Sequence, residues 1–417
     1  MNVLLLVFSN FLSLKEKNAG IYADLVREFV NDGHTVYRLY LVDKVENKAE
    51  QVYKEPGQVV VKTTVGKIRG NSNLISKGIE TVLLEPRIKT TVKKYFSDVH
   101  FDLVLFATPP ITFYSAVRYV KKRDHALCYL MLKDIFPQGA LDLQMLSETG
   151  LKGFIYRAFR RKEKKLYGVA DYIGCMSPAN IAYLLKHNDY VPKDKVELLP
   201  NSIVPVKNTC TESEKTQTRQ QFHIPDDSIV FAYGGNLGKP QGIPFIIDLL
   251  KEVGQRRTTN ADVGRAQFVI AGEGSEYGKL QEYCMADQPE FVKLIPRMKQ
   301  EVYDSLLASS DIGLVFLDNR FTIPNFPSRI LNYMQSQMPV LCFTDPNTDI
   351  GSLAEEGGFG WNGRSDDVQK AADLVCRICS SFNDASFVQM RQKSWDYFVE
   401  NYDVAKAYST IAKHFMS

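Results

Sequence analysis

The sequence predicts an α/β protein of two similarly built halves, each a parallel sheet covered by helices. Three observations support this fold class. Short apolar runs of strand length alternate with amphipathic stretches of helical period. Small, polar or turn-forming residues follow most of these runs, at the carboxyl ends of the expected strands. A polar segment without periodicity, residues 203–226, separates the two series and is interpreted as a linker.

Length and composition fit this prediction. The chain has 417 residues, of which 45% are apolar and 24% charged, as in an ordinary globular protein with room for two or three domains. Charge is unevenly spread: residues 1–205 hold 30 Lys and Arg against 21 Asp and Glu, or +9, and the remainder carries −6. A basic first half indicates an anionic partner there, a phosphorylated acceptor or a membrane surface, and we expect no nucleic acid.

The cysteines and the first residues indicate the compartment. Seven scattered cysteines favour a reducing environment, and Cys376 and Cys379 lie in an expected helix, residues 366–381, without a second Cys/His pair to complete a zinc site. The opening MNVLLLVFSN is interpreted as a strand rather than a signal peptide. No run of about 18 apolar residues occurs, so we expect a cytoplasmic protein whose membrane contact, if any, is peripheral and on the inner face.

The first half opens with a strand–helix–strand unit. A strand over residues 2–9 is followed by Ser9-Asn10, a loop over 15–20, a helix over 21–30 and a second strand to residue 41, with Gly20 at the helix start. Further strands are expected at residues 59–65, 103–106, 126–132, 172–175 and 196–199. Asp134 is the one carboxylate at such a strand end in this half, either in a site or as a cap of the next segment.

Residues 153–168 predict a basic amphipathic helix. Phe154, Ile155, Phe159 and Leu166 fall roughly on one side, and Glu163 is the single acid in the stretch. Its cations, with one flanking lysine, are Lys152, Arg157, Arg160, Arg161, Lys162, Lys164 and Lys165. Such a helix either lies on an anionic membrane or packs its apolar side into the core and exposes a solvated basic face.

The second half repeats the strand-and-turn pattern. A strand over 229–233 runs into Gly234-Gly235-Asn236 and Lys239, before a helix over 243–253. The strand over 268–271 leads to Gly272-Glu273-Gly274, and that over 292–296 to Arg297-Met298. Strands over 312–317 and 339–343 follow, and two helical stretches close the chain, the last over 404–415.

A short helix opening at Pro327-Ser328-Arg329 is the candidate phosphate seat. Ile330, Leu331 and Met334 would face the sheet, whereas Ser328, Arg329 and Asn332 would lie on the free side. A helix N-terminus attracts anions, and Arg329 adds a fork-shaped cation there. Asn332 is placed to reach the sugar hydroxyls of a nucleotide. The alternative is a capped helix with a solvated arginine.

This order of motifs resembles the retaining glycosyltransferases of family 4, and within it the bacterial O-antigen branch that includes N-acetylfucosamine transferases. The fold of that family, GT-B, is a pair of facing Rossmann-like domains with a cleft between them. The resemblance implies an acceptor-binding domain at 1–205, a nucleotide-sugar-binding domain at 206–385, and helices at 386–417 that pack back on the first domain. The matching pieces are Gly20, Gly33-His34-Thr35-Val36, Pro200-Asn201, Gly234-Gly235-Asn236, Ala271-Gly272-Glu273-Gly274, Pro327-Ser328-Arg329 through Met334, and Pro339-Val340.

Three departures from the family pattern matter. The usual glutamate pair, spaced E-x7-E, would fall on Pro324 and Asn332. The Arg and Lys that hold the diphosphate in many members correspond to Asn236 and Gln241, with Lys239 nearby as a substitute. The usual glycine two residues before the last strand is Gln337.

The resemblance implies transfer of a sugar, with retention, from a nucleotide diphosphate sugar (a UDP-sugar) to a glycan or polyprenyl-linked acceptor. The catalytic residues would be Asp134, Lys239 and Arg329, and Gly20 would line the acceptor side with Asp134. Nothing implies a metal or another cofactor. The nucleotide-sugar site would consist of Gly235, Asn236, Gly272, Glu273, Arg297, Met298, Ser328, Arg329 and Asn332.

Two other classes share this fold. A nucleotide-sugar 2-epimerase would need acidic residues and histidines in the cleft, and the six scattered histidines form no obvious set. A non-catalytic partner subunit would keep the fold after losing both glutamates.

Overall fold

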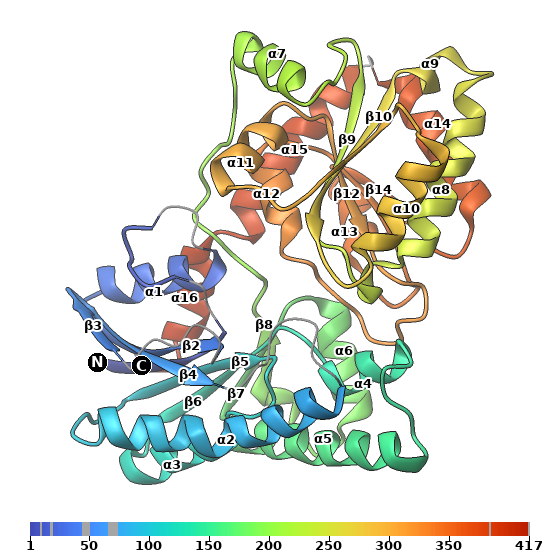
Figure 1. The fold of residues 1–417 in the computed structure, drawn as a ribbon. Coiled ribbons are helices and arrows are strands. Elements are labelled where there is room, and N and C mark those ends of the chain that lie inside the picture. The colour runs from blue at the N-terminus through green and yellow to red at the C-terminus, as the bar shows by residue number, and fades with distance from the viewer. Residues whose placement is uncertain (9–10, 17–19, 44–50, 66–73, 383–384, 416–417) are drawn as a thin grey trace. The chain divides into compact units, whose positions relative to one another are not determined.

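The chain forms two compact α/β units (Figure 1). In this computed structural model the described residues are 1–417 apart from 9–10, 17–19, 44–50, 66–73, 383–384 and 416–417, so Ser9-Asn10 and part of the expected 15–20 loop lie outside them. The first unit is Met1–Val204 with Asp403–Ser417, and the second is Pro205–Tyr402. We expected residues 386–417 to pack together on the first domain, but α15 (Ala385–Asn401) belongs to the second unit and only α16 (Val404–Ala412) to the first.

The first unit contains an eight-stranded sheet in the order β3-β4-β2-β1-β5-β6-β7-β8. Neighbouring strands are parallel except for the antiparallel pair β3 and β4. The sequence did not predict β3, an edge strand that is almost fully exposed and therefore lacks an apolar pattern. The strands are β1 (Asn2–Leu6), β2 (Thr35–Asp43), β3 (Gln51–Glu55), β4 (Gln58–Val65), β5 (Leu103–Thr108), β6 (Leu127–Leu132), β7 (Tyr172–Cys175) and β8 (Val196–Leu198).

Helices cover both faces of this sheet. On one face α1 (Ile21–Asn31) and α16 pack with Val3 and Leu5 of β1, and the apolar layer includes Phe29 and Ile411. Along the other face lie α2, α3 and α5, side by side in Figure 1. The remaining helices of the unit are α2 (Leu74–Phe96), α3 (Tyr114–Asp124), α4 (Phe136–Asp142), α5 (Gly150–Val169) and α6 (Pro178–His187).

The second unit contains a six-stranded parallel sheet in the order β11-β10-β9-β12-β13-β14. The apolar runs predicted its first five strands in sequence order, and β14 is an addition. The strands are β9 (Ile229–Asn236), β10 (Ala266–Glu273), β11 (Val292–Ile295), β12 (Ile312–Phe316), β13 (Val340–Thr344) and β14 (Gly360–Arg364).

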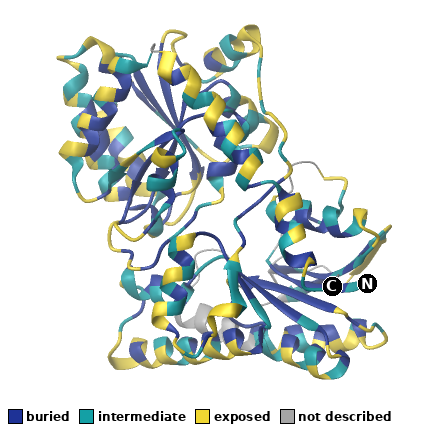
Figure 2. Cartoon of the chain, turned by 180° about the vertical axis from the view of Figure 1, so that it is seen from behind, coloured by how far each residue is buried: buried dark blue, intermediate teal, exposed yellow. Residues whose placement is uncertain are grey.

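Burial in the second unit centres on this sheet, whose strands are mostly dark in Figure 2. Helices α8 and α14 contribute to the largest apolar cluster, with Phe231, Phe268 and Phe316 of the sheet. The C-x-x-C pair lies inside α14, as the sequence predicted. The helices not yet given are α7 (Glu212–Gln221), α8 (Ile243–Arg257), α9 (Ala261–Gly264), α10 (Tyr277–Asp287), α11 (Gln300–Ala308), α12 (Arg329–Gln335), α13 (Ile350–Glu356) and α14 (Val368–Ser381).

The expected linker, residues 203–226, is wrong in its second half, which contains α7. Thr211 and Glu214 form a reciprocal capping box at its start, and Arg219 ties the helix to the buried carboxylate of Asp311 with an Nη2–Oδ2 distance of 2.9 Å. The T-x-x-E signature was present in the sequence. Almost every residue of α7 is polar, so no apolar periodicity revealed the helix.

Each sheet has one place where the strand order reverses, between β1 and β5 in the first unit and between β9 and β12 in the second. Ligands of open α/β sheets bind beyond the carboxyl ends of the strands at such a place. No helix in the described ranges is long and apolar enough to cross a bilayer.

Candidate functional site

The reversal point of the second sheet brings Gly235, at the end of β9, against Arg329, at the start of α12. A Cβ built on Gly235 would lie 3.5 Å from both Cζ and Nη1 of Arg329. Gly235 has φ +134, a conformation that residues with side chains rarely adopt. Gly272 of β10 also has to be glycine, because its Cβ would lie 1.9 Å from the carbonyl oxygen of Gly235. Gly235 and Gly272, both predicted site residues, therefore allow the backbone to lie close to Arg329, the third.

The guanidinium of Arg329 is held among aromatic side chains. Its Cζ lies 4.4 Å from the ring centroid of Tyr233, and the hydroxyls of Tyr303 and Tyr333 interact with it electrostatically. Nη1 is buried and has no hydrogen-bond partner among the described residues. We expected Arg329 on the free side of its helix, and this expectation was wrong for the head of the side chain. A buried cationic nitrogen without an acceptor is costly, so this geometry suits an incoming anion.

Helix α12 itself contributes less than expected to an anion site. Ile330, Leu331 and Met334 are buried, as predicted. However, α12 has only seven residues, and Ser328 at its start is exposed, with helical backbone angles and no side-chain capping bond. A helix this short has a small macrodipole. The cation of Arg329 therefore carries most of the positive charge at this place.

The loop after β9 is shaped by a buried amide rather than by a cation. Gln241 is 6% exposed, and its Oε1 accepts hydrogen bonds from Asn236 Nδ2 and from the backbone N–H of Gly238, both at 3.1 Å. Asn236 and Lys239 are exposed on the same loop. Gln241, at the position where the resembled family has a lysine, thus braces the loop and leaves Lys239 as its exposed cation.

The other predicted donor-site residues occupy the rim of the same sheet edge. Glu273 is the last residue of β10 and accepts from Arg297 Nη1 at 2.9 Å, both side chains being largely exposed. Met298 turns away and packs partly against the apolar cluster of Val230 and Leu306, which the sequence did not predict. Asn332 is half-buried, one turn beyond Ser328.

The two residues predicted on the acceptor side, Gly20 and Asp134, lie in the first unit. Gly20 is exposed, precedes α1 and has φ +86. Asp134 follows β6, and its carbonyl oxygen accepts from Thr108 Oγ1 at 2.8 Å, which joins the ends of β5 and β6. Burial raises the pKa of the Asp134 carboxyl to about 6, although the N–H of Ile135 partly offsets this effect. Asp134 is therefore ionised at neutral pH, with a pKa close enough to pH 7 to matter.

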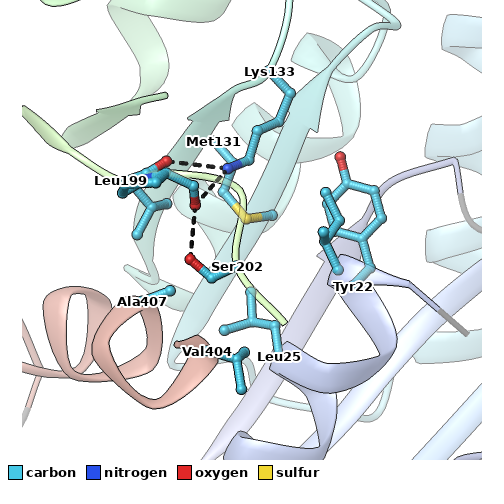
Figure 3. Close-up of a pocket in the computed structure, with 10 residues that line it drawn as sticks. Tyr22, Leu25, Met131, Lys133, Leu199, Ser202, Val404 and Ala407 are labelled. Atoms are coloured by element: carbon cyan, nitrogen blue, oxygen red, sulfur yellow. Dashed lines mark hydrogen bonds between the residues drawn. The ribbon is translucent and has the colours of Figure 1, made fainter. Parts of the chain in front are cut away.

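Lys133, next to Asp134, is a half-buried amine that the sequence analysis missed. Its Nζ donates to the carbonyl oxygens of Leu199 and Pro200, at 3.1 and 3.3 Å (Figure 3). Burial lowers the pKa of the Lys133 amine to about 7. Its long side chain lines a small, mostly apolar pocket at the carboxyl end of the sheet. The other lining residues are Ile21, Tyr22, Leu25, Met131, Leu199, Pro200, Ser202, Val404 and Ala407.

No group of three or more His, Cys, Asp or Glu side chains within the described part of the chain is arranged to hold a metal ion. The candidate site residues are Arg329, Lys239 and backbone amides in the second unit, and Asp134 beside Lys133 in the first. Such groups stabilise negative charge on a leaving group and orient a hydroxyl.

Two parallel-sheet α/β units with these reversal points define the GT-B fold. Solved structures with this fold include HepE from Anabaena in complex with UDP (TM-score 0.66, 13% identity, full coverage of both chains). They also include WaaG, a glycosyltransferase involved in lipopolysaccharide biosynthesis (TM-score 0.66, 12% identity, 99% of both chains).

By sequence, the chain is similar to probable glycosyltransferase WbjE of Pseudomonas aeruginosa. The two are 24% identical over 318 residues, which cover 75% of this chain and 74% of WbjE. No family model matches the sequence.

Proposed function

We propose that this protein is a retaining glycosyltransferase that moves a sugar from a UDP-sugar to a growing, lipid-linked surface polysaccharide. The observation that carries the proposal is the buried Nη1 of Arg329, which lacks an acceptor beside the backbone of Gly235. A diphosphate oxygen would supply that acceptor. Similarity to WbjE, and to structures described with UDP or with lipopolysaccharide biosynthesis, supports the same class.

The proposed chemistry needs charge stabilisation more than a strong base. As the glycosidic bond to the diphosphate breaks, Arg329, Lys239 and the N–H groups at Gly235–Asn236 stabilise the leaving charge. One well-placed donor contributes about 3 kcal/mol to such a transition state. Ser328 adds a hydroxyl, Glu273 and Arg297 meet the base, and Asn332 meets the ribose. Retention requires the acceptor hydroxyl to attack on the face that the diphosphate leaves.

On the acceptor side, Asp134 is proposed to accept a hydrogen bond from the attacking hydroxyl. With a pKa of about 6, its carboxylate is mostly ionised at pH 7 but is only weakly basic. Such a group orients the hydroxyl and takes up its proton late in the reaction. Gly20 supports the same side, since it lacks a side chain that would limit access to the end of the sheet.

We also propose that α5 lets the protein bind an anionic membrane peripherally, on the inner face where a polyprenyl-linked acceptor would be presented. Leu151 and Phe154 are 72% and 62% exposed, and Arg157, Arg161 and Lys165 lie on the same outer side. Exposed apolar residues beside cations are what an interfacial helix needs. Exposed cations of the neighbouring helices extend this basic face: Lys93, Arg118 and Lys122.

The structure corrects parts of the sequence-based account of this helix. Phe159 and Leu166 are buried, so they are core residues rather than membrane contacts. Arg160 pairs with the buried Glu163, and Lys162 pairs with Glu85. The cations left for a membrane are therefore those of the outer side.

Two incubations and a UDP-binding measurement distinguish the proposed function from its alternatives. The protein is first given each of several UDP-sugars alone, then with a polyprenyl diphosphate-linked glycan acceptor, and the products are followed by mass spectrometry and anomeric NMR. Transfer with retention supports the proposal. A sugar epimerised without acceptor would identify an epimerase, and neither product together with absent UDP binding would identify a non-catalytic subunit.

A further inference from the structure

The segment between β12 and α12, residues 318–328, leads directly into Arg329 and therefore sets its position. It has no regular secondary structure over most of its length, but Phe321, Ile323 and Phe326 are each less than 5% exposed. At its start, the backbone N–H of Asp318 donates to Pro240 O at 2.9 Å. Because this hydrogen bond holds only the start of the loop, the position of its middle depends on other contacts.

Two hydrogen bonds join the middle of the loop to the turn that follows β13, residues 345–348. Asn347 Nδ2 donates to Phe321 O at 2.7 Å, and the backbone N–H of Asn325 donates to Thr348 Oγ1 at 3.0 Å. The turn is itself organised by Asp345. One carboxylate oxygen, Oδ1, accepts from the N–H groups of Asn347 and Thr348, and the other, Oδ2, accepts from Thr348 Oγ1 at 2.9 Å.

We infer that Asp345 is a positioning residue for the donor site and acts on Arg329 through Thr348 and the 318–328 loop. An ionised carboxylate can only accept hydrogen bonds, so the Thr348 hydroxyl has to donate to it. The lone pairs of that hydroxyl are then directed at the N–H of Asn325. Asn325 lies three residues before Ser328. The hydrogen bonds that run from Asp345 through Thr348 to Asn325 therefore fix the position of the backbone just before α12 begins.

Burial makes this role specific. Asp345 is 2% exposed and Thr348 is 8% exposed, so water does not replace either partner when one is removed. The positions where the resembled family has its glutamate pair, Pro324 and Asn332, bracket the start of α12. This inference rests on the proposed function, because it takes the donor diphosphate as the ligand of Arg329.

The experiment compares two isosteric or near-isosteric changes at Thr348. Thr348→Val removes the hydroxyl and keeps the shape, whereas Thr348→Ser keeps the hydroxyl. The dissociation constant of UDP is measured by calorimetry, and kcat and KM for the donor by the transfer assay. We expect Thr348→Val and Asp345→Asn to raise the donor KM and the UDP dissociation constant at least tenfold. Thr348→Ser should stay within twofold of the wild type.

Asp311→Asn is the matched control for general destabilisation. Asp311 is a second carboxylate of the same unit, 4% exposed, that accepts from the N–H of Val230 and from Arg219. It precedes β12, at the sheet edge away from Arg329. We expect it to lower the melting temperature as much as Asp345→Asn does, without changing UDP affinity at temperatures where it is folded.

Two results would overturn the inference: UDP affinity of Thr348→Val equal to that of Thr348→Ser, or an equal loss of affinity in Asp311→Asn. If Asp345→Asn does not fold, the pair of Thr348 variants decides. Failure of the wild-type protein to bind UDP or any other nucleotide diphosphate would overturn the proposed function instead.

Discussion

The guanidinium of Arg329 lies over the ring of Tyr233, with Cζ 4.4 Å from the ring centroid. The ring stabilises the cation from one face, and the Tyr233 side chain also makes a hydrogen bond with the guanidinium. Nη1, which has no hydrogen-bond partner among the described residues, stays available while the head of the side chain is held in one orientation. Pre-organisation of this kind lowers the entropy that is lost when an anion binds.

The first prediction concerns this residue. Arg329→Ala should weaken UDP or UDP-sugar binding at least tenfold, because a hydrogen bond to a charged group contributes about 1.5 kcal/mol or more. The melting temperature of the unliganded protein should barely change, whereas the increase caused by UDP should be lost. Arg265→Ala is the control, since that arginine precedes β10 at the opposite sheet edge. Unchanged nucleotide affinity in Arg329→Ala would exclude Arg329 from the site.

A second prediction uses the pKa of Asp134. The folded protein holds this proton more tightly than the unfolded chain, so the group contributes stability below pH 4 that is lost as pH rises through about 6. Asp134→Asn should therefore melt at a higher temperature than the wild type at pH 8, and the difference should vanish near pH 4. The lowered pKa of Lys133 has the opposite sign, but it is present in both proteins. A difference that stays constant between pH 4 and 8 would contradict the burial of the carboxyl.

The same carboxylate should control the rate of transfer. In the wild type, kcat should fall as pH drops through about 6, because protonated Asp134 no longer accepts from the attacking hydroxyl. Asp134→Asn should be slower at pH 8, by roughly tenfold or more, and should lack this acid limb. UDP affinity serves as the control, because Asp134 lies outside the nucleotide-sugar unit. An acid limb that persists in the variant would assign the titration to another group.

Metal independence is a fourth prediction. Transfer in excess chelator should stay within about twofold of the untreated rate, since the charge on the diphosphate is assigned to Arg329, Lys239 and backbone amides rather than to Mg²⁺. The assay is the transfer reaction with and without EDTA, followed by added Mg²⁺ or Mn²⁺. Complete loss of activity that either ion restores would show that the assignment is wrong.

Membrane binding through α5 is the fifth prediction. Replacing Arg157, Arg161 and Lys165 with Gln should reduce co-sedimentation with anionic vesicles at low salt about a hundredfold, because each cation near the leaflet contributes about 1 kcal/mol. The matched control replaces three exposed lysines of the second unit, Lys251, Lys279 and Lys370, with Gln. UDP binding should persist in both triple variants. Equal sedimentation of the two would place the membrane contact elsewhere.

The fold was predictable because its strands are apolar runs. Strands such as Val3–Leu6 and Ile312–Phe316 are buried on both faces of a parallel sheet. They therefore consist of consecutive apolar residues, a pattern that is visible in the sequence. Elements that bury little escaped prediction. The edge strand β3 and the polar helix α7 are held by hydrogen bonds and charge, which leave no period in the sequence.

The site was predictable only in part, for a different reason. Gly235 follows an apolar run and Arg329 opens a short helix, and both positions can be recognised from the neighbouring residues in the sequence. That Nη1 of Arg329 is buried follows from tyrosines at 233, 303 and 333, which only the fold brings together. Likewise, Gln241, Asp345 and Lys133 resemble ordinary polar residues in the sequence. Their roles come from partners that no spacing rule reveals.

The return of α16 to the first unit has a consequence for how the chain is made. On the ribosome, the segment that ends at Val204 emerges before the second unit, but its apolar layer lacks Val404, Ala407 and Ile411 until α16 has been translated. The second unit, Pro205–Tyr402, is contiguous and can fold as soon as it has emerged. Most of the first unit is therefore translated before the second but finishes folding after it, with the nascent chain exposing Phe29 and its neighbours in the interval.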